Sequence, residues 1–296
     1  AEYELSLPDA GARQGVGATL AVSGDRMLVG SSFGAIELQR DAGGWGHSGT
    51  LVVPRGTTRP GTGLPVALDG DRAAILLGSP EPDALDGGAN PELYLFERSD
   101  LAWKVVGSFS LPAPLTVTDS GRRLAFGGDD LVVGTGREVR IYRRNAGGAW
   151  AFEAALLPDL ALTPAANFQG LGFGRAVAID GDTMLVTDQE TAALYVYERR
   201  DGTWTFSQFL RVENRLSDDG FGSEVAIRGD LAWVGLPRRS SGGSVFRYRR
   251  VGGTWSLEEE VQPADLTTSA AFGSAIATDG KRTVIGDPGQ GGSRGA

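Results

Sequence analysis

The sequence of 296 residues contains no cysteine, one histidine and two methionines, and each shortage excludes a class of structure or chemistry. Without cysteine the chain has neither a disulfide framework nor a thiolate metal site. His47 alone cannot form a histidine cluster for zinc, and no serine is expected to be followed by the helix that a nucleophile elbow requires. We therefore expect neither a zinc centre nor nucleophilic catalysis by a Ser/His/Asp triad.

Long apolar runs and clustered positive charge are missing as well. No stretch approaches the roughly 18 apolar residues of a membrane-spanning helix, and the acidic start of the chain is unlike a signal peptide. The net charge is −9 and the arginine pairs are spread along the chain, which argues against a nucleic-acid partner. We expect no membrane span and no nucleic-acid binding.

Glycine is abundant, with 45 residues, and this composition favours many tight turns over many helices. A Gly-Asp dipeptide recurs about every 50 residues, the spacing of a four-stranded propeller blade. A small-apolar segment precedes each copy, as in "RAVAIDGD", and a second apolar segment follows it, as in "TMLVTD". The copies are Gly24-Asp25, Gly70-Asp71, Gly128-Asp129, Gly181-Asp182, Gly229-Asp230 and the variant Gly280-Lys281.

A third segment of alternating aromatic or aliphatic residues follows, such as "ALYVYERR", and then a tryptophan opens a more polar fourth segment. This order predicts four antiparallel strands per repeat. The Gly-Asp pair would close the hairpin between strands one and two, because glycine readily adopts positive φ. We expect the tryptophan to pack at the outer edge of its sheet, and the arginine pairs that end the third strands to serve surface solubility.

A single repeat cannot bury both faces of its sheet, so the repeats must stack, and a ring removes the exposed ends of the stack. The sequence therefore predicts an all-β fold, a six-bladed β-propeller forming one domain over residues 1–296. The predicted blade cores are 15–53, 63–112, 121–158, 172–213, 220–262, and 271–296 together with 1–8.

The closing blade is predicted to be shared by the two ends of the chain. The sequence ends where a third strand should begin, and residues 4–7 align with the fourth strand of other repeats. Three possibilities stay open. Residues 1–7 form the third strand of a three-stranded blade, the sequence is cut short, or another chain supplies the missing strand in an exchanged dimer.

Three segments carry a resemblance to a known family, namely "GFGRAVAIDGDTMLVTD", "GFGSEVAIRGDLAWVGLP" and "AFGSAIATDGKRTVIGDP". They resemble bacterial FG-GAP repeats, which also build the integrin α-subunit head. The resemblance implies a β-propeller and, for function, an exported adhesion or binding protein. Calcium-binding members have a long acidic loop between strands one and two. Here that loop is only Gly-Asp, too short for the oxygens that calcium requires, so we expect no cofactor and no metal site.

One group of candidate ligand-binding residues lies in the acidic stretch "GSPEPDALDGGANPE", which joins two strands of the second repeat. It contains Glu81, Asp83 and Asp86, and carboxylates in such a loop could bind a cation or a sugar. The alternative is a solvated acidic insertion.

A second group follows the fourth strands, with Asp159, Asp218, Asp219 and Asp265 in the connections that lead to the next repeat. In a ring these connections would open near the axis. Paired carboxylates there could act as acid and base on a glycosidic bond if one were shielded from water. The alternative is that each aspartate caps its own turn.

Arg228-Gly229-Asp230 spells the tripeptide that integrins bind, but the repeat places x-Gly-Asp at every such hairpin. The sequence thus favours a non-catalytic, secreted, periplasmic or cell-surface module that holds a carbohydrate or protein ligand on one propeller face or at the axial opening. The alternative is a carbohydrate-active hydrolase or lyase with carboxylates at the axial mouth.

Overall fold

The computed structural model describes residues 16–17, 19–54, 63–78, 91–99, 102–112, 123–159, 161–162, 172–212, 219–239, 242–264 and 270–289. The contacts within the chain divide it into two compact units. Unit 1 comprises Ala1–Ser120 and Ala146–Trp150, and unit 2 comprises Gly121–Asn145 and Ala151–Ala296. The residues predicted to close a ring, 1–8 and 290–296, lie outside the described part.

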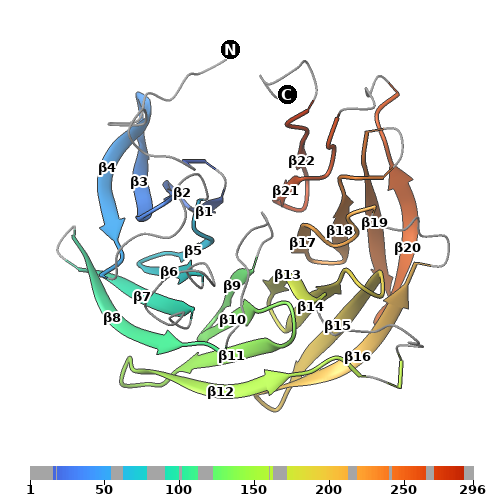
Figure 1. Ribbon diagram of the computed structural model, residues 1–296, viewed down its shortest axis with the longest axis horizontal. Helices are drawn as coiled ribbons and strands as arrows, with labels where there is room; N and C mark the ends of the chain where they lie inside the picture. Colours follow the sequence, from blue (N-terminus) through green and yellow to red (C-terminus); the bar gives the residue numbers. More distant parts are fainter. Residues whose placement is uncertain are drawn as a thin grey trace, which may run out of the picture. The chain divides into compact units, whose positions relative to one another are not determined.

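Unit 1 contains two four-stranded antiparallel sheets, each with its strands in sequence order (Figure 1). The first consists of β1 (Leu20–Ser23), β2 (Arg26–Ser31), β3 (Gly34–Asp41) and β4 (Gly44–Val52). The second consists of β5 (Val66–Asp69), β6 (Arg72–Leu77), β7 (Glu92–Ser99) and β8 (Ala102–Ser110).

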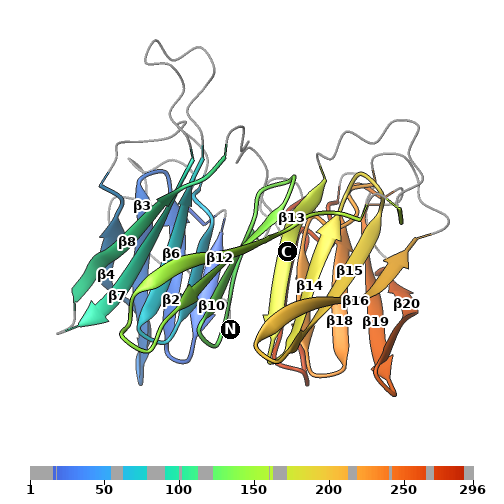
Figure 2. The ribbon, with the colours of Figure 1, turned by 90° about the horizontal axis from the view of Figure 1, so that it is seen from below.

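Unit 2 contains three more sheets of this kind and a two-stranded sheet (Figure 2). Their strands are β9 (Leu124–Gly127), β10 (Asp130–Gly134), β11 (Val139–Arg144), β12 (Trp150–Leu156), β13 (Phe173–Asp180), β14 (Thr183–Asp188), β15 (Ala193–Arg200), β16 (Thr203–Arg211), β17 (Val225–Arg228), β18 (Leu231–Leu236), β19 (Ser244–Val251), β20 (Thr254–Val261), β21 (Ala275–Thr278) and β22 (Thr283–Gly286). Within the described ranges, five repeats thus confirm the predicted four antiparallel strands and the sixth shows two.

The Gly-Asp turn closes the first hairpin of a repeat as predicted. In the fourth repeat Asp180 pairs with Thr183, and Gly181 has a φ of 58° at the first position of the two-residue loop. Glycine avoids the steric strain that other residues meet at this φ. The last repeat differs, because Thr278 pairs with Thr283 and encloses a four-residue loop. The variant Gly280-Lys281 therefore does not form the predicted two-residue hairpin.

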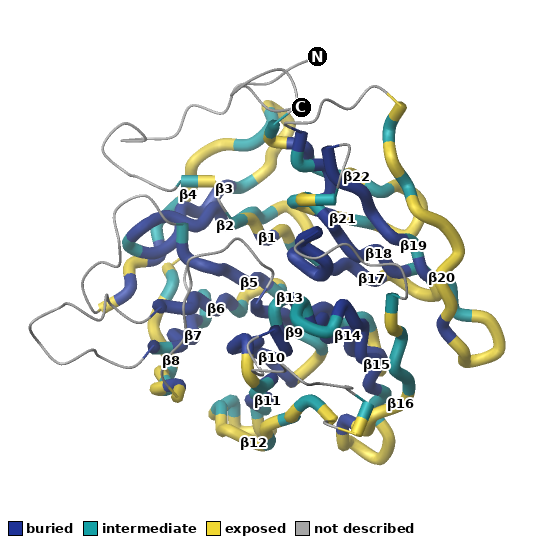
Figure 3. The backbone as a smooth tube through the Cα atoms, turned by 45° about the vertical axis from the view of Figure 1, so that its right-hand side comes forward, coloured by how far each residue is buried: buried dark blue, intermediate teal, exposed yellow. Residues whose placement is uncertain are grey.

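In the first five repeats the second strands are largely buried and the fourth strands are more exposed, whereas β22, the second strand of the sixth repeat, is not buried. Every residue of β14 is buried, but β20 exposes most of its length (Figure 3). This gradient explains the sequence pattern of each repeat. An apolar second strand lies between neighbouring sheets, and a polar fourth strand faces water.

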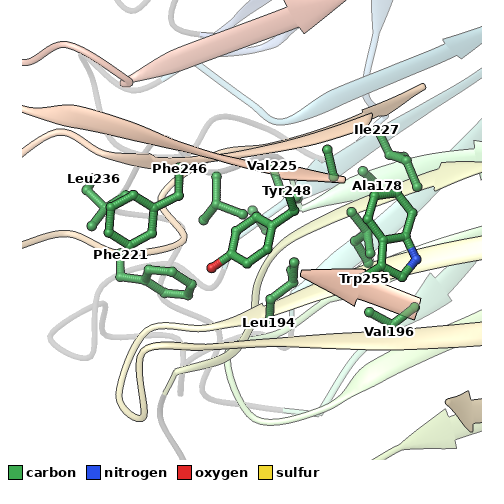
Figure 4. Close-up of a cluster of buried hydrophobic side chains, with 14 of the residues drawn as sticks. Ala178, Leu194, Val196, Phe221, Val225, Ile227, Leu236, Phe246, Tyr248 and Trp255 are labelled. Atoms are coloured by element: carbon green, nitrogen blue, oxygen red, sulfur yellow. The ribbon is translucent and has the colours of Figure 1, made fainter. Parts of the chain in front are cut away.

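Tryptophan at the start of the fourth strand packs against the preceding sheet. Trp255 on β20 is 1% exposed and belongs to a cluster with Ala178 and Val196 of the sheet β13–β16 (Figure 4). Gln208 on β16 accepts a hydrogen bond from the Trp255 N–H at 2.8 Å and donates one to its carbonyl at 2.7 Å. This tryptophan is buried between its own sheet and the preceding one and joins the two, rather than packing only at the outer edge of its own sheet.

The arginines that end the third strands tie the structure together, which corrects the expectation that they serve surface solubility. Arg250 lies 5.2 Å from the centre of the Trp255 ring and bonds Asp230 of its own Gly-Asp turn at 2.7 Å. It also donates to the Thr183 hydroxyl in the preceding sheet at 2.9 Å. The Gly-Asp pair, the arginine and the tryptophan thus recur in a fixed order because they touch one another.

The glycines of the FG and GAP positions let neighbouring sheets approach at backbone distance. A Cβ atom added to Gly134 would lie 2.0 Å from the Gly174 carbonyl oxygen, and one added to Gly235 would lie 2.0 Å from the Gly273 carbonyl oxygen. At these two positions a side chain would therefore force the sheets apart. In the fourth repeat Thr187 takes this place, and its hydroxyl donates to the Gly222 carbonyl at 2.9 Å.

Candidate functional site

Two of the seven predicted ligand-binding residues, Asp159 and Asp219, lie in the described part of the chain. The other five lie outside it: Glu81, Asp83, Asp86, Asp218 and Asp265. The acidic loop and the convergence of the four connecting aspartates therefore stay predictions.

Asp219 is 4% exposed and is fully engaged in its own turn. Its Oδ1 accepts the Phe221 N–H at 3.0 Å, and its backbone carbonyl accepts the Arg238 N–H at 3.0 Å. Its Oδ2 faces Arg239 at 3.5 Å, and Arg239 in turn bonds Glu260 at 2.6 Å. This geometry is that of the turn-capping alternative.

Asp159 follows β12 and is exposed. Its Oδ1 accepts the Ala161 N–H at 2.9 Å and its carbonyl accepts the Leu162 N–H at 3.1 Å. The Asp159 charge also acts on Tyr197 of β15. The pKa of Tyr197 is raised mainly by burial and to a smaller extent by this charge. Asp159 thus caps a turn and presents a carboxylate to water next to aromatic side chains.

Two buried aspartates that sequence reasoning did not single out occupy equivalent places at the end of the second strand. Asp188 is 0% exposed, and its Oδ1 accepts the amides of Glu190 and Thr191 at 3.0 and 3.3 Å. Asp287 is 5% exposed, and its Oδ1 accepts the Ala271 amide at 2.9 Å. The Oδ2 atom of each is buried without a hydrogen-bond partner.

The position of these two aspartates within the repeat can be read from the sequence. Ser31 and Thr135 stand seven residues after their anchoring glycines, as Asp188 and Asp287 do, and all four side chains are small and polar. The Thr135 hydroxyl accepts the Glu138 N–H at 3.1 Å and donates to the Glu138 carbonyl. A polar residue here caps the turn that leads to the third strand.

The electrostatic environment of Asp188 is unusual for a carboxylate. Burial raises its pKa, Glu190 acts in the same direction, and hydrogen bonds from Thr191 and the Glu190 amide oppose the shift. On the adjacent strand, burial and the Asp188 charge raise the pKa of Tyr195. The Tyr195 hydroxyl is also buried without a hydrogen-bond partner. Burial and neighbouring acidic charges thus raise the pKa values of both groups.

The Arg-Gly-Asp tripeptide is engaged by the chain's own residues. Arg228 bonds Asp180 of the preceding hairpin at 2.9 Å, and the Gly229 N–H donates to the same carboxylate at 2.6 Å. Asp230 is held by Arg250 at 2.7 Å. The tripeptide therefore fastens neighbouring hairpins.

We expect Asp230→Asn to leave cell adhesion to the purified protein unchanged, because the tripeptide already has intramolecular partners. Its stability should fall by at most about 1 kcal/mol, as for an exposed ion pair. Counting adherent integrin-bearing cells on coated surfaces checks this, with thermal unfolding as the control for folding. Adhesion that is lost in the variant would show that the tripeptide is recognised.

Two further findings concern the described residues. They contain no group of three or more His, Asp or Glu side chains with the arrangement of a metal site. They also contain no helix that is long and apolar enough to cross a membrane.

No family model matches the sequence, and no curated protein matches it. Solved structures do resemble it. The Myceliophteria thermophila Cps50 (Swd1) beta-propeller domain is 13% identical, with a TM-score of 0.55 over 93% of this chain and 80% of that one. The fold is that of a β-propeller.

Two other solved structures share this propeller fold. The "putative 6-phosphogluconolactonase" of Bacteroides uniformis is 13% identical, with a TM-score of 0.60 over 89% of this chain and 75% of that one. A chain in the Saccharomyces cerevisiae assembly of dbp5 with nup159 and gle1 is 11% identical, with a TM-score of 0.54 over 97% and 75%. At these identities the likeness carries the fold and no function.

Proposed function

We propose that this propeller is a non-catalytic binding module of an exported protein. Its ligand, a carbohydrate or a protein, would lie on the loops that lead from one sheet to the next. One observation carries the proposal, namely that Asp159 on one of these loops presents an exposed carboxylate, whereas both carboxylate oxygens of Asp219 are engaged within the chain. Loops that a rigid repeat scaffold holds in place are a common location for binding residues.

The repeat is proposed to be of the FG-GAP kind. The contact between the FG glycine of one sheet and the GAP glycine of the preceding sheet supports this, since it gives both dipeptides one physical purpose. Gly273 against Gly235 is an example, with backbone atoms where a Cβ would have to lie. FG-GAP repeats occur in exported adhesion proteins, and we propose for this reason that the protein acts outside the cytoplasm.

The alternative is a hydrolase or lyase that acts on carbohydrates. Such chemistry needs one carboxyl group that stays protonated and a second that is ionised, placed on either side of the scissile bond. Asp219 is poorly suited to either role, because Phe221 and Arg239 already occupy its two oxygens. The alternative therefore depends on Asp218 and Asp265.

The ligand class can be tested on the full chain with a glycan array and with 6-phosphogluconolactone as a trial substrate. We expect retention of a glycan or a protein partner without release of product. Asp159→Asn should weaken binding at least tenfold, because it removes the exposed charge beside Tyr197. Binding would be measured by isothermal titration and product formation by mass spectrometry.

Asp201→Asn is the matched control, because Asp201 is also exposed but lies in the turn between β15 and β16. Its positive φ of 50° suits asparagine as well as aspartate. Equal loss of binding in both variants would contradict the proposed location. Product release that disappears in Asp218→Asn or Asp265→Asn would overturn the non-catalytic proposal in favour of the enzyme.

A further inference from the structure

The turn between β14 and β15 is held by a carboxylate in a place where a neutral group suffices. Thr135 caps the equivalent turn of the preceding sheet with a hydroxyl, and Ser31 occupies the same place in the first repeat. Asp188 uses one oxygen for the same purpose and leaves the other, Oδ2, buried and without a donor. A buried ionised oxygen without a donor or a counter-ion is strongly unfavourable.

The packing around Asp188 leaves no room for water to compensate. Its side chain has no exposed surface, and a Cβ atom added to Gly172 would lie 2.5 Å from Oδ1. Gly172 thus covers the carboxyl closely, and its carbonyl also accepts the Gln189 N–H at 3.2 Å. The carboxyl is enclosed by the sheet and by its own turn.

Acidic and phenolic groups lie around this carboxyl, together with the Thr191 side chain of the same turn, which opposes the upward shift of its pKa. Glu190 lies in the turn, and Tyr195 lies on β15, where it pairs with Val186 on the same face as Asp188. Asp159, which follows β12, acts on Tyr195 from the neighbouring sheet.

We propose that Asp188 makes the β14–β15 turn proton-dependent: the neutral carboxyl fits its closed site and holds the turn, and the ionised carboxylate loosens it. The neutral carboxyl carries no charge, so the lack of a donor at the buried Oδ2 costs it much less than it costs the carboxylate. The module would then be most rigid at this turn in acid and would loosen toward neutral pH. This property is independent of which ligand the module binds.

The sign of the effect follows from linkage between protonation and folding. The pKa of Asp188 in the folded chain lies above that of an unfolded aspartate, about 4, because burial disfavours the charge. The stabilisation is therefore complete below about pH 4 and is lost as the pH rises through the folded pKa. Carboxylates whose pKa is lowered in the folded chain, such as Glu258 beside Arg249, contribute in the opposite direction, so the effect must be isolated by comparison with a variant.

The test is hydrogen exchange of the Glu190 and Thr191 amides in the full chain between pH 4 and pH 8, corrected for intrinsic exchange. Asp188→Asn keeps the Oδ1 acceptor and removes the charge. Relative to this variant, protection in the unmodified protein should fall by up to tenfold per pH unit above about pH 4 and then level off. A ratio that is constant over the whole range would overturn the proposal.

Two other variants keep the test decisive if asparagine disturbs folding. Asp188→Thr copies the neutral cap of Thr135 and should show the same pH-independent protection as Asp188→Asn. Tyr195→Phe removes a buried hydroxyl that makes no hydrogen bond to the carboxyl, so the pH-dependent change should persist in this variant. A pH-dependent change that remains in Asp188→Thr would assign the effect to other groups and refute the role of Asp188.

Discussion

Gly235→Ala is expected to destabilise the chain by about 3 kcal/mol or more, because overpacking against the backbone leaves few ways to relax. The added Cβ would lie 2.0 Å from the Gly273 carbonyl oxygen, and the two sheets would have to separate. Gly235 does not have a positive φ, so alanine suits its backbone and the effect measures the contact between sheets. Thermal and urea unfolding would show the loss as a lower midpoint.

Gly46→Ala is the matched control for this prediction. Gly46 also lies in a strand without positive φ, but no atom lies within 4 Å of the place that a Cβ would take. Alanine there should leave stability unchanged or raise it by a few tenths of a kcal/mol, since it restricts the unfolded chain. Equal losses in the two variants would contradict the glycine contact as the reason for the FG and GAP positions.

Asp130→Ala is expected to cost about 3 to 5 kcal/mol, as when one partner of a buried ion pair is removed. The side chain is 0% exposed and accepts bonds from Arg143 at 2.7 Å, from Arg199, and from the Trp204 indole N–H at 2.7 Å. Arg199 and Trp204 belong to the next sheet, so one carboxylate joins two sheets. The midpoint of thermal unfolding should fall by roughly 10 °C.

The natural control is Asp230→Ala, which removes an ion pair of the same chemistry with Arg250. The Asp230 side chain is 64% exposed, so water replaces the lost partner and the expected effect is at most about 1 kcal/mol. Asp130→Asn should lie between the two, since it keeps an acceptor for one donor. An Asp130 variant as mild as the Asp230 variant would show that the buried cluster does not join the sheets.

Local pattern predicted the strands and their order within each repeat. Alternation, glycine with positive φ and the recurrent tryptophan are properties of neighbouring residues, and they led to the correct hairpins in the first five repeats. The sixth was wrong at Gly280-Lys281, where the loop spans four residues. With lysine in place of aspartate, the turn lacks the Gly-Asp pair that the other repeats share.

The site was less predictable for a physical reason. Whether an aspartate caps a turn or meets a ligand depends on which amides its oxygens face, and Asp159, Asp218 and Asp219 look alike in sequence. Asp188 was not among the predicted site residues, because the residues that precede it in the sequence have the pattern of an apolar strand. Its buried oxygen is visible only when Gly172 and Tyr195 are in place around it.

By itself the sequence determined the repeat, the all-β class and the position of each turn, because these depend on backbone preference and on side chains close together in the chain. Only the tertiary structure decided what the charged residues do. Arg199 and Asp130 lie far apart in sequence, and burial between sheets turns their weak attraction in water into a contact that the fold depends on. The same burial makes Asp188 a group that prefers its proton.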